Sequence, residues 1–317
     1  MTLNDIPAAV ISFGILPYLS PRQLLNLLVT KTNFWPLIIV ALEQHDFFIV
    51  PCMSSDLLTT AVSQVKAIRK ILHLTTITPS TIVVVAPEDQ HRALPVATGE
   101  DAVREVVVID FSGITIVGRT THSSKDKSVT IHQRIHVNKG ATHVIFRDIT
   151  IANNCNKSLT RSSIFNSSGI TVSNLGTSLT MERCCVHNMQ ANSCVHSAAH
   201  GLVVTDGAHA TAVKCQFHDN EKSGIFVRGV GSRLTIVDGA CANNQDYGAQ
   251  VERGGTVTLF GKTKIHHNNW YGLGAYGRGS TITIGSRECI IAENTNDSYG
   301  SKYGYSKEGG IIQLLCE

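Results

Sequence analysis

Hydrophobic and polar residues alternate with a period of two through the C-terminal part of this 317-residue chain. Four consecutive segments open with Gly201, Gly224, Gly248 and Gly272, at spacings of 23, 24 and 24 residues. In each segment the first and third residues after the glycine are apolar, as in "GLVV", "GIFV", "GAQV" and "GLGA". Such alternation predicts a β-strand with one face directed inward and the other outward.

Each segment repeats this logic in a second strand that carries threonine at an outward position, for which a β-branched residue is well suited. The threonine column comprises Thr180, Thr211, Thr235, Thr258 and Thr283. Asparagine follows at the turn of each unit, at Asn220, Asn244, Asn268 and Asn294. Asparagine tolerates the left-handed backbone conformation, and its amide can bond the turn backbone or the equivalent asparagine one rung away.

A period near 24 with short strands, a glycine corner and an asparagine corner predicts a mainly β fold, the right-handed parallel β-helix. We expect it to span residues 79–317, with longer excursions at 86–104, 119–128 and 155–168. Residues 46–78 would form a linker and a helical cap, because residues 56–74 have apolar side chains at helical spacing. A cap is needed since an unpaired end rung promotes aggregation.

The first 45 residues follow a different pattern, which predicts a small helical module. Asp5 can cap a first helix with Pro7 in its first turn, and Ser20 followed by Pro21 can begin another. Two or three short helices in about 40 residues cannot bury their own apolar faces. The module therefore requires a partner surface.

The order of residues in this module resembles the F-box family. The resemblance is carried by Ile6, Pro7, Val10, Ile15, Leu16, Tyr18, Leu19, Leu24, Leu25, Leu27, Val29, Lys31, Phe34 and Trp35. It implies that the module binds the Skp-type adaptor of a cullin-RING ubiquitin ligase, while the remaining domain binds the substrate. The residues it implies for adaptor binding are Ile6, Pro7, Val10, Ile15, Leu16, Leu19, Leu24, Leu25 and Val29. The order of domains is similar to that of F-box proteins with a β-helix of the carbohydrate-binding and sugar-hydrolysis type.

Charge and cysteine content narrow the class of protein. Lys plus Arg number 27 against 24 Asp plus Glu, and no run of like charges predicts a nucleic-acid or membrane partner. The nine cysteines contain no CxxC pair, which favours reduced thiols in a cytoplasmic or nuclear protein. We expect no signal peptide, and the apolar run at 34–42 is shorter than the roughly 20 residues that span a bilayer.

Acidic residues do not align in a way that predicts catalysis. One outward column contains Thr205, Arg228, Glu252 and Tyr276, and we expect Arg228 and Glu252 to form a salt bridge. Glycoside hydrolysis needs two facing carboxylates, and a calcium-dependent lyase needs clustered carboxylates beside a base. The candidate acids fall in different columns, at Asp110, Glu182, Asp219, Asp238 and Glu293. We predict no catalytic residues, and a site assembled across loops stays open as an alternative.

One segment has the residue types of a zinc site. Cys185 and His187 share a strand face, and further candidates follow at Cys194, His196 and His200. Zinc accepts cysteine and histidine, but this spacing fits no standard pattern, so we predict no metal and no cofactor. The alternative is a stack of histidines, because equivalent places in their units are occupied by His187, His218 and His266.

These patterns together predict a non-enzymatic substrate-recognition subunit of an SCF-type ubiquitin ligase. The β-helix would bind a target protein through outward columns and excursions. The residues we expect to contact that target are Phe226, Arg228, Gln250, Glu252 and Tyr276. Two other interpretations stay open. One is a carbohydrate-active lyase, hydrolase or binder whose N-terminal helices cap the fold, and the other is a structural solenoid.

Overall fold

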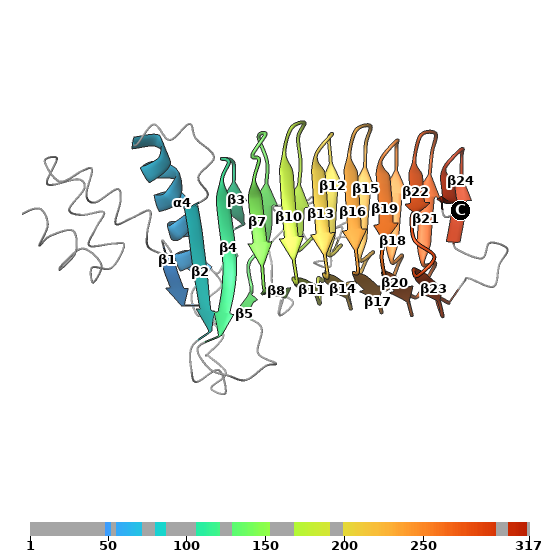
Figure 1. The fold of residues 1–317 in the computed structure, drawn as a ribbon, viewed down its shortest axis with the longest axis horizontal. Helices are drawn as coiled ribbons and strands as arrows, with labels where there is room; N and C mark the ends of the chain where they lie inside the picture. Colours follow the sequence, from blue (N-terminus) through green and yellow to red (C-terminus); the bar gives the residue numbers. More distant parts are fainter. Residues whose placement is uncertain are drawn as a thin grey trace, which may run out of the picture.

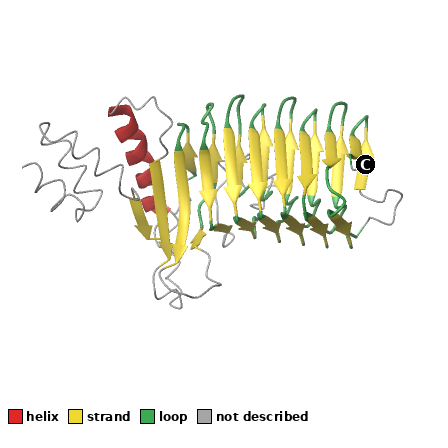
Figure 2. Cartoon of the chain, viewed as in Figure 1, coloured by secondary structure: helices red, strands yellow, loops and turns green. Residues whose placement is uncertain are grey.

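A computed structural model of the chain describes residues 48–51, 55–71, 80–86, 106–120, 129–152, 168–190, 199–295 and 304–315. The predicted F-box-like module lies outside these ranges, as do Cys194, His196 and most of the predicted excursions. Within the described residues, three parallel sheets wind into a mainly β solenoid with one helix on its N-terminal side (Figure 1 and Figure 2). The predicted β-helix is therefore confirmed.

A complete rung contributes one strand to each sheet, and the rungs at the N-terminal end contribute fewer. The ten-stranded sheet contains β1 (Phe48–Pro51), β2 (Ser80–Ala86), β4 (Ile114–Thr120), β7 (Val144–Arg147), β10 (Ser178–Glu182), β13 (His209–Val213), β16 (Arg233–Val237), β19 (Thr256–Phe260), β22 (Thr281–Ile284) and β25 (Ile311–Leu314). The eight-stranded sheet contains β3 (Val107–Ile109), β6 (Ile135–Val137), β9 (Ile170–Val172), β12 (Leu202–Thr205), β15 (Ile225–Arg228), β18 (Ala249–Glu252), β21 (Leu273–Tyr276) and β24 (Gly304–Lys307). The seven-stranded sheet contains β5 (Val129–Ile131), β8 (Ile149–Ala152), β11 (Cys185–His187), β14 (Gln216–His218), β17 (Ala240–Ala242), β20 (Lys264–His266) and β23 (Ile290–Ala292).

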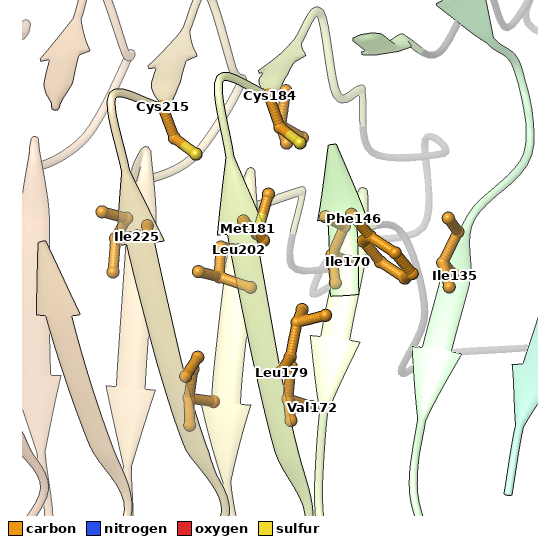
Figure 3. Packing of buried hydrophobic residues seen from close by; sticks show 14 of the residues in the cluster. Ile135, Phe146, Ile170, Val172, Leu179, Met181, Cys184, Leu202, Cys215 and Ile225 are labelled. Carbon is orange, nitrogen blue, oxygen red and sulfur yellow. The ribbon is translucent and has the colours of Figure 1, made fainter. Parts of the chain in front are cut away.

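Inward side chains of successive rungs form columns that make up the core. Ile170, Leu202 and Ile225 are paired in register and fully buried, and Figure 3 shows them among other core side chains. Burial of one such side chain stabilises the fold by about 1.5–3 kcal/mol. The period-two pattern of the sequence therefore sets both the strand register and the core.

Asparagine forms a buried ladder along one corner, as predicted. The Nδ2 of Asn220 donates to Oδ1 of Asn244 at 2.9 Å, and the same contact joins Asn244 to Asn268 at 2.9 Å. Asn268 donates in turn to Asn294 at 2.8 Å.

The ladder asparagines do not themselves adopt the left-handed conformation. Positive φ occurs at the residue before each one, at Asp219, Asn243, His267 and Glu293. The preceding residue makes the turn, which leaves the asparagine side chain directed inward to reach the next rung.

The predicted cap is the helix α4 (Ser55–Ile71), which contacts β1, β2 and β3 at the N-terminal end of the solenoid (Figure 1). Its buried face has helical spacing of three and four and comprises Leu58, Ala61, Val62 and Val65. On its exposed side, Lys66 Nζ lies 2.6 Å from a carboxylate oxygen of Asp110. This hydrogen bond is the main reason that the pKa of Asp110 falls below its ordinary value.

Strand pairing begins earlier than the sequence predicted. Residues 46–78 are predicted to contain only a linker and the cap, but β1 lies in that segment and pairs in parallel with β2, which follows it. A strand of four residues is too short for periodicity to distinguish it from a loop.

Candidate functional site

The five predicted substrate-binding residues lie together on the outward side of the eight-stranded sheet. Phe226 pairs with Gln250, and Arg228 pairs with Glu252, which pairs with Tyr276 on the next rung. All five side chains are half-buried, whereas the inward residues between them are fully buried. The predicted outward columns are thus confirmed, and a role in binding stays a prediction.

The prediction of a salt bridge between Arg228 and Glu252 is wrong. The two residues are in register, yet no ion pair joins them in the part of the chain that the structure describes. Glu252 instead accepts a hydrogen bond from Gln250 Nε2 at 3.0 Å, and Gln250 Oε1 accepts one from Ser223 Oγ at 3.0 Å. The carboxylate turns toward its strand neighbour Gln250, which is oriented by Ser223.

Beside these columns lies a cluster that we call the aromatic patch, formed by Tyr247, Trp270, Tyr271, Tyr276 and Tyr305. The ring centroid of Tyr247 is 5.4 Å from that of Trp270, and that of Tyr271 is 5.2 Å from that of Tyr305. Tyr276 meets Tyr247 edge-on at 5.9 Å, and the two hydroxyl groups form a hydrogen bond. Each aromatic pair adds about 0.5–1.5 kcal/mol beyond its burial, so the rings hold one another in place.

A glycine makes room for the patch. Gly274 occupies the outward position that Phe226 and Gln250 fill on earlier rungs. A Cβ there would lie 2.7 Å from Cδ1 and Cε1 of Tyr247 and 3.1 Å from Cε2 of Tyr276. The ring of Tyr247 therefore lies directly over bare backbone.

The patch combines a rigid base with an exposed rim. Tyr247 is buried, whereas Trp270 is 46% exposed and Tyr305 is 36% exposed. Tyrosine and tryptophan are enriched in binding interfaces because a large ring is immobilised at low entropic cost. An exposed aromatic cluster of this kind is typical of an interaction site.

Charges at the edge of the patch are partly shielded from solvent. Burial raises the pKa of Asp246, while Lys222 Nζ, 3.9 Å from its Oδ2, favours the charged form. Burial also raises the pKa of the Tyr247 and Tyr276 hydroxyl groups. Both phenols are therefore neutral at physiological pH and available as hydrogen-bonding groups.

His200 supports the opposite end of the face. Its ring stacks on Phe226, with centroids 4.7 Å apart, and its Nδ1 accepts a hydrogen bond from the backbone N–H of Ser223 at 3.2 Å. Burial lowers the pKa of His200 to about 3, so the ring is neutral. Among the described residues, no three or more His, Cys, Asp or Glu side chains are arranged so that they could hold a metal ion.

The predicted stack of histidines is present in part. His187 and His218 stack with centroids 4.9 Å apart, whereas Ala242 stands between His218 and His266 in the register.

The acids considered for catalysis each contact a nearby group and lie on different rungs. Glu182 pairs with Arg147 at 2.8 Å, Asp219 with His218 at 2.6 Å and Glu293 with His267 at 3.1 Å. Asp110 pairs with Lys66, and Asp238 accepts a hydrogen bond from the backbone of Lys262 at 2.9 Å. These contacts are explained by local packing and turn stabilisation.

Comparison with known proteins agrees with the architecture. A family model described as "Right handed beta helix region" matches residues 190–312. No curated protein and no solved structure matched the chain. Together, the three parallel sheets and this match define a right-handed parallel β-helix. Among the described residues, no helix has the length and apolar character needed to cross a membrane.

Proposed function

We propose that this chain is the substrate-recognition subunit of a cullin-RING ubiquitin ligase. In this proposal residues 1–45 bind a Skp-type adaptor, and the outward face of the eight-stranded sheet binds a target protein. The observation that carries the proposal is the F-box-like pattern placed ahead of a rigid solenoid that presents an aromatic patch. A solenoid is well suited to this role because its extended face keeps a fixed shape.

The position of α4 supports a separate role for the first 45 residues. In the alternative interpretation, those residues form a cap on the end of the β-helix. The buried face of α4 already packs into the same hydrophobic core as the rungs. An additional cap is therefore not required at that end, and the apolar residues of the module are better explained by a partner.

The composition of the face suits a protein partner. The steps from β15 to β24 span about 14 Å along the solenoid, at roughly 4.8 Å per rung. The aromatic patch lies at one end, and the polar residues Arg228, Gln250 and Glu252 lie beside it. Aromatic anchors flanked by hydrogen-bonding groups are the usual arrangement at a binding interface.

A pull-down with a purified Skp-type adaptor tests the proposal. We expect the full chain to retain the adaptor and the Ile6→Asp, Leu24→Asp double variant to lose it. A Trp270→Ala, Tyr305→Ala variant serves as a matched control that should bind the adaptor normally. Failure of the wild-type chain to bind, with a β-rich circular dichroism spectrum that shows it is folded, would contradict the proposal.

Carbohydrate binding is a second candidate, which the aromatic patch specifically favours. Exposed rings such as Trp270 and Tyr305 can stack on the apolar face of a sugar while nearby amide and carboxylate groups bond its hydroxyls. A glycan array probed with the full chain tests this candidate. Binding that is abolished by Trp270→Ala would support it, and binding to no glycan by a folded chain would count against it.

A further inference from the structure

A second cluster of reactive side chains lies on the outward side of the seven-stranded sheet. Cys185 Sγ is 3.1 Å from Nε2 of His218, and Nδ1 of His218 is 2.6 Å from Oδ2 of Asp219. Cys185 belongs to β11 and His218 to the adjacent strand β14, where the residue in register with Cys185 is Gln216. The thiol therefore reaches the imidazole diagonally, from one rung to the next.

The hydrogen bonds define the role of each group. An ionised carboxylate only accepts, so Asp219 fixes the proton of His218 on Nδ1. The lone pair of Nε2 then faces the thiol, which donates to it. A nucleophile within hydrogen-bond reach of a base that a third group orients is the signature of covalent catalysis.

We propose that Cys185 is a nucleophile that accepts an acyl group from an activated ester or thioester, with His218 as its general base and Asp219 as a positioning residue. This site is on a different sheet from the aromatic patch and does not depend on the proposed ligase function.

The surroundings hold the imidazole in one orientation. His187 stacks on His218 with centroids 4.9 Å apart and planes 6° apart. Burial, with a smaller effect of His218, lowers the pKa of His187, so this neighbour is neutral. The side chains of His218 and Asp219 are 29% and 46% exposed, and Cys185 itself is half-buried rather than enclosed in the core.

The other described thiols differ from Cys185 in their surroundings. Cys184, Cys215 and Cys241 are buried in the core. Cys289 is half-buried like Cys185, but its Sγ contacts the carbonyl oxygen of Gly261 at 3.5 Å. Cys289 is therefore a matched internal control for thiol reactivity.

The reaction balances without an oxidant or a reductant. Burial raises the pKa of Cys185 to about 12, so the resting thiol is protonated and requires a base. As Sγ attacks the carbonyl carbon, its proton moves to His218 Nε2, and Asp219 stabilises the imidazolium. The tetrahedral intermediate then collapses, the bond to the leaving alkoxide or thiolate breaks, and that group takes the proton from Nε2. Water activated by the same imidazole can later release the acyl group as a carboxylic acid.

Acetylation of the full chain by p-nitrophenyl acetate, located by peptide mass spectrometry, tests the proposal. We expect Cys185 to be acetylated at least tenfold faster than Cys289, since general-base catalysis contributes about 10²–10⁴-fold. His218→Gln should reduce the rate at Cys185 at least tenfold and leave Cys289 unchanged. Equal rates at Cys185 and Cys289, or a rate at Cys185 that His218→Gln does not alter, would overturn it.

Variants of Asp219 keep the test valid if His218→Gln unfolds the chain, which acetylation of the buried Cys184 would reveal. Asp219→Asn presents an amide to Nδ1 and should slow Cys185 acetylation by weakening control of the tautomer. Asp219→Glu retains a carboxylate and should restore part of the rate. A purely structural role predicts that both variants react like the wild type, and that result would also overturn the proposal.

Discussion

Removal of one ladder asparagine should destabilise the whole solenoid. The side chain of Asn268 has five hydrogen-bond contacts: Oδ1 accepts from the backbone N–H of Asn244 at 3.1 Å and from its Nδ2 at 2.9 Å. Nδ2 contacts the carbonyl oxygens of Cys241 and His266 at 3.2 Å each and Oδ1 of Asn294 at 2.8 Å. The side chain is fully buried, so water cannot replace these contacts in the folded state.

The expected loss follows from the net value of each bond. An amide nitrogen has two hydrogens, so its three contacts count as two, which leaves four effective hydrogen bonds. At about 1 kcal/mol each, the Asn268→Ala variant should lose about 3–4 kcal/mol of unfolding free energy. That change lowers the ratio of folded to unfolded chain by a factor of about 10²–10³.

Urea denaturation followed by circular dichroism measures the effect, and Asn269→Ala is the control. Asn269 is adjacent but exposed, so its substitution should change the unfolding free energy by less than about 0.5 kcal/mol. A loss below about 1 kcal/mol for Asn268→Ala, or equal losses for both variants, would refute the reasoning.

Three further predictions concern the cap, the buried histidine and the glycine of the patch. Leu58→Ala should lower the unfolding free energy by about 2–5 kcal/mol, because Leu58 is buried, whereas Thr60→Ala should leave it almost unchanged, because Thr60 is exposed. Equal urea midpoints for the two variants would show that α4 does not cap the core. His200 has a folded pKa of about 3, below its unfolded value of about 6.5, so its contribution to stability is lost as the pH falls below 6.5. Between pH 7 and pH 5 the unfolding free energy of the wild type should therefore fall by about 2 kcal/mol more than that of His200→Phe. Parallel profiles of unfolding free energy against pH would contradict this. Gly274→Ala should displace Tyr247, alter the near-ultraviolet circular dichroism and lower the unfolding free energy by about 1–3 kcal/mol. An unchanged aromatic spectrum would show that the ring does not need the glycine.

Sequence alone predicted the repeated part of the fold because each rung solves the same packing problem. One core column is formed by Leu202, Ile225, Ala249 and Leu273. The spacing of these residues in the sequence predicts the strand register directly. The cap was equally visible, since the apolar residues of α4 follow a helical period. Such features depend on periodicity, which a sequence displays.

The features that sequence analysis missed depend on the directions of side chains at the corners and insertions of the solenoid. Tyr247, Trp270 and Tyr271 precede their strands, so the turn decides where their rings point. The glycine at position 274, opposite bulky residues on earlier rungs, was the one available signal for the patch. The sequence placed His187 and His218 at equivalent positions of their units, which the pairing of β11 with β14 confirms. The contact from Cys185 to His218 was missed because it is diagonal and depends on the directions of the two side chains.

Hydrogen–deuterium exchange of the full chain, with and without a purified Skp-type adaptor, tests the central claim most directly. In the proposed function, the first 45 residues bind the adaptor and the aromatic patch binds the target. We therefore expect the adaptor to protect peptides covering residues 6–29 and to leave peptides covering residues 245–276 unchanged. Protection of the β-helix face alone, or no protection anywhere at saturating adaptor, would contradict it.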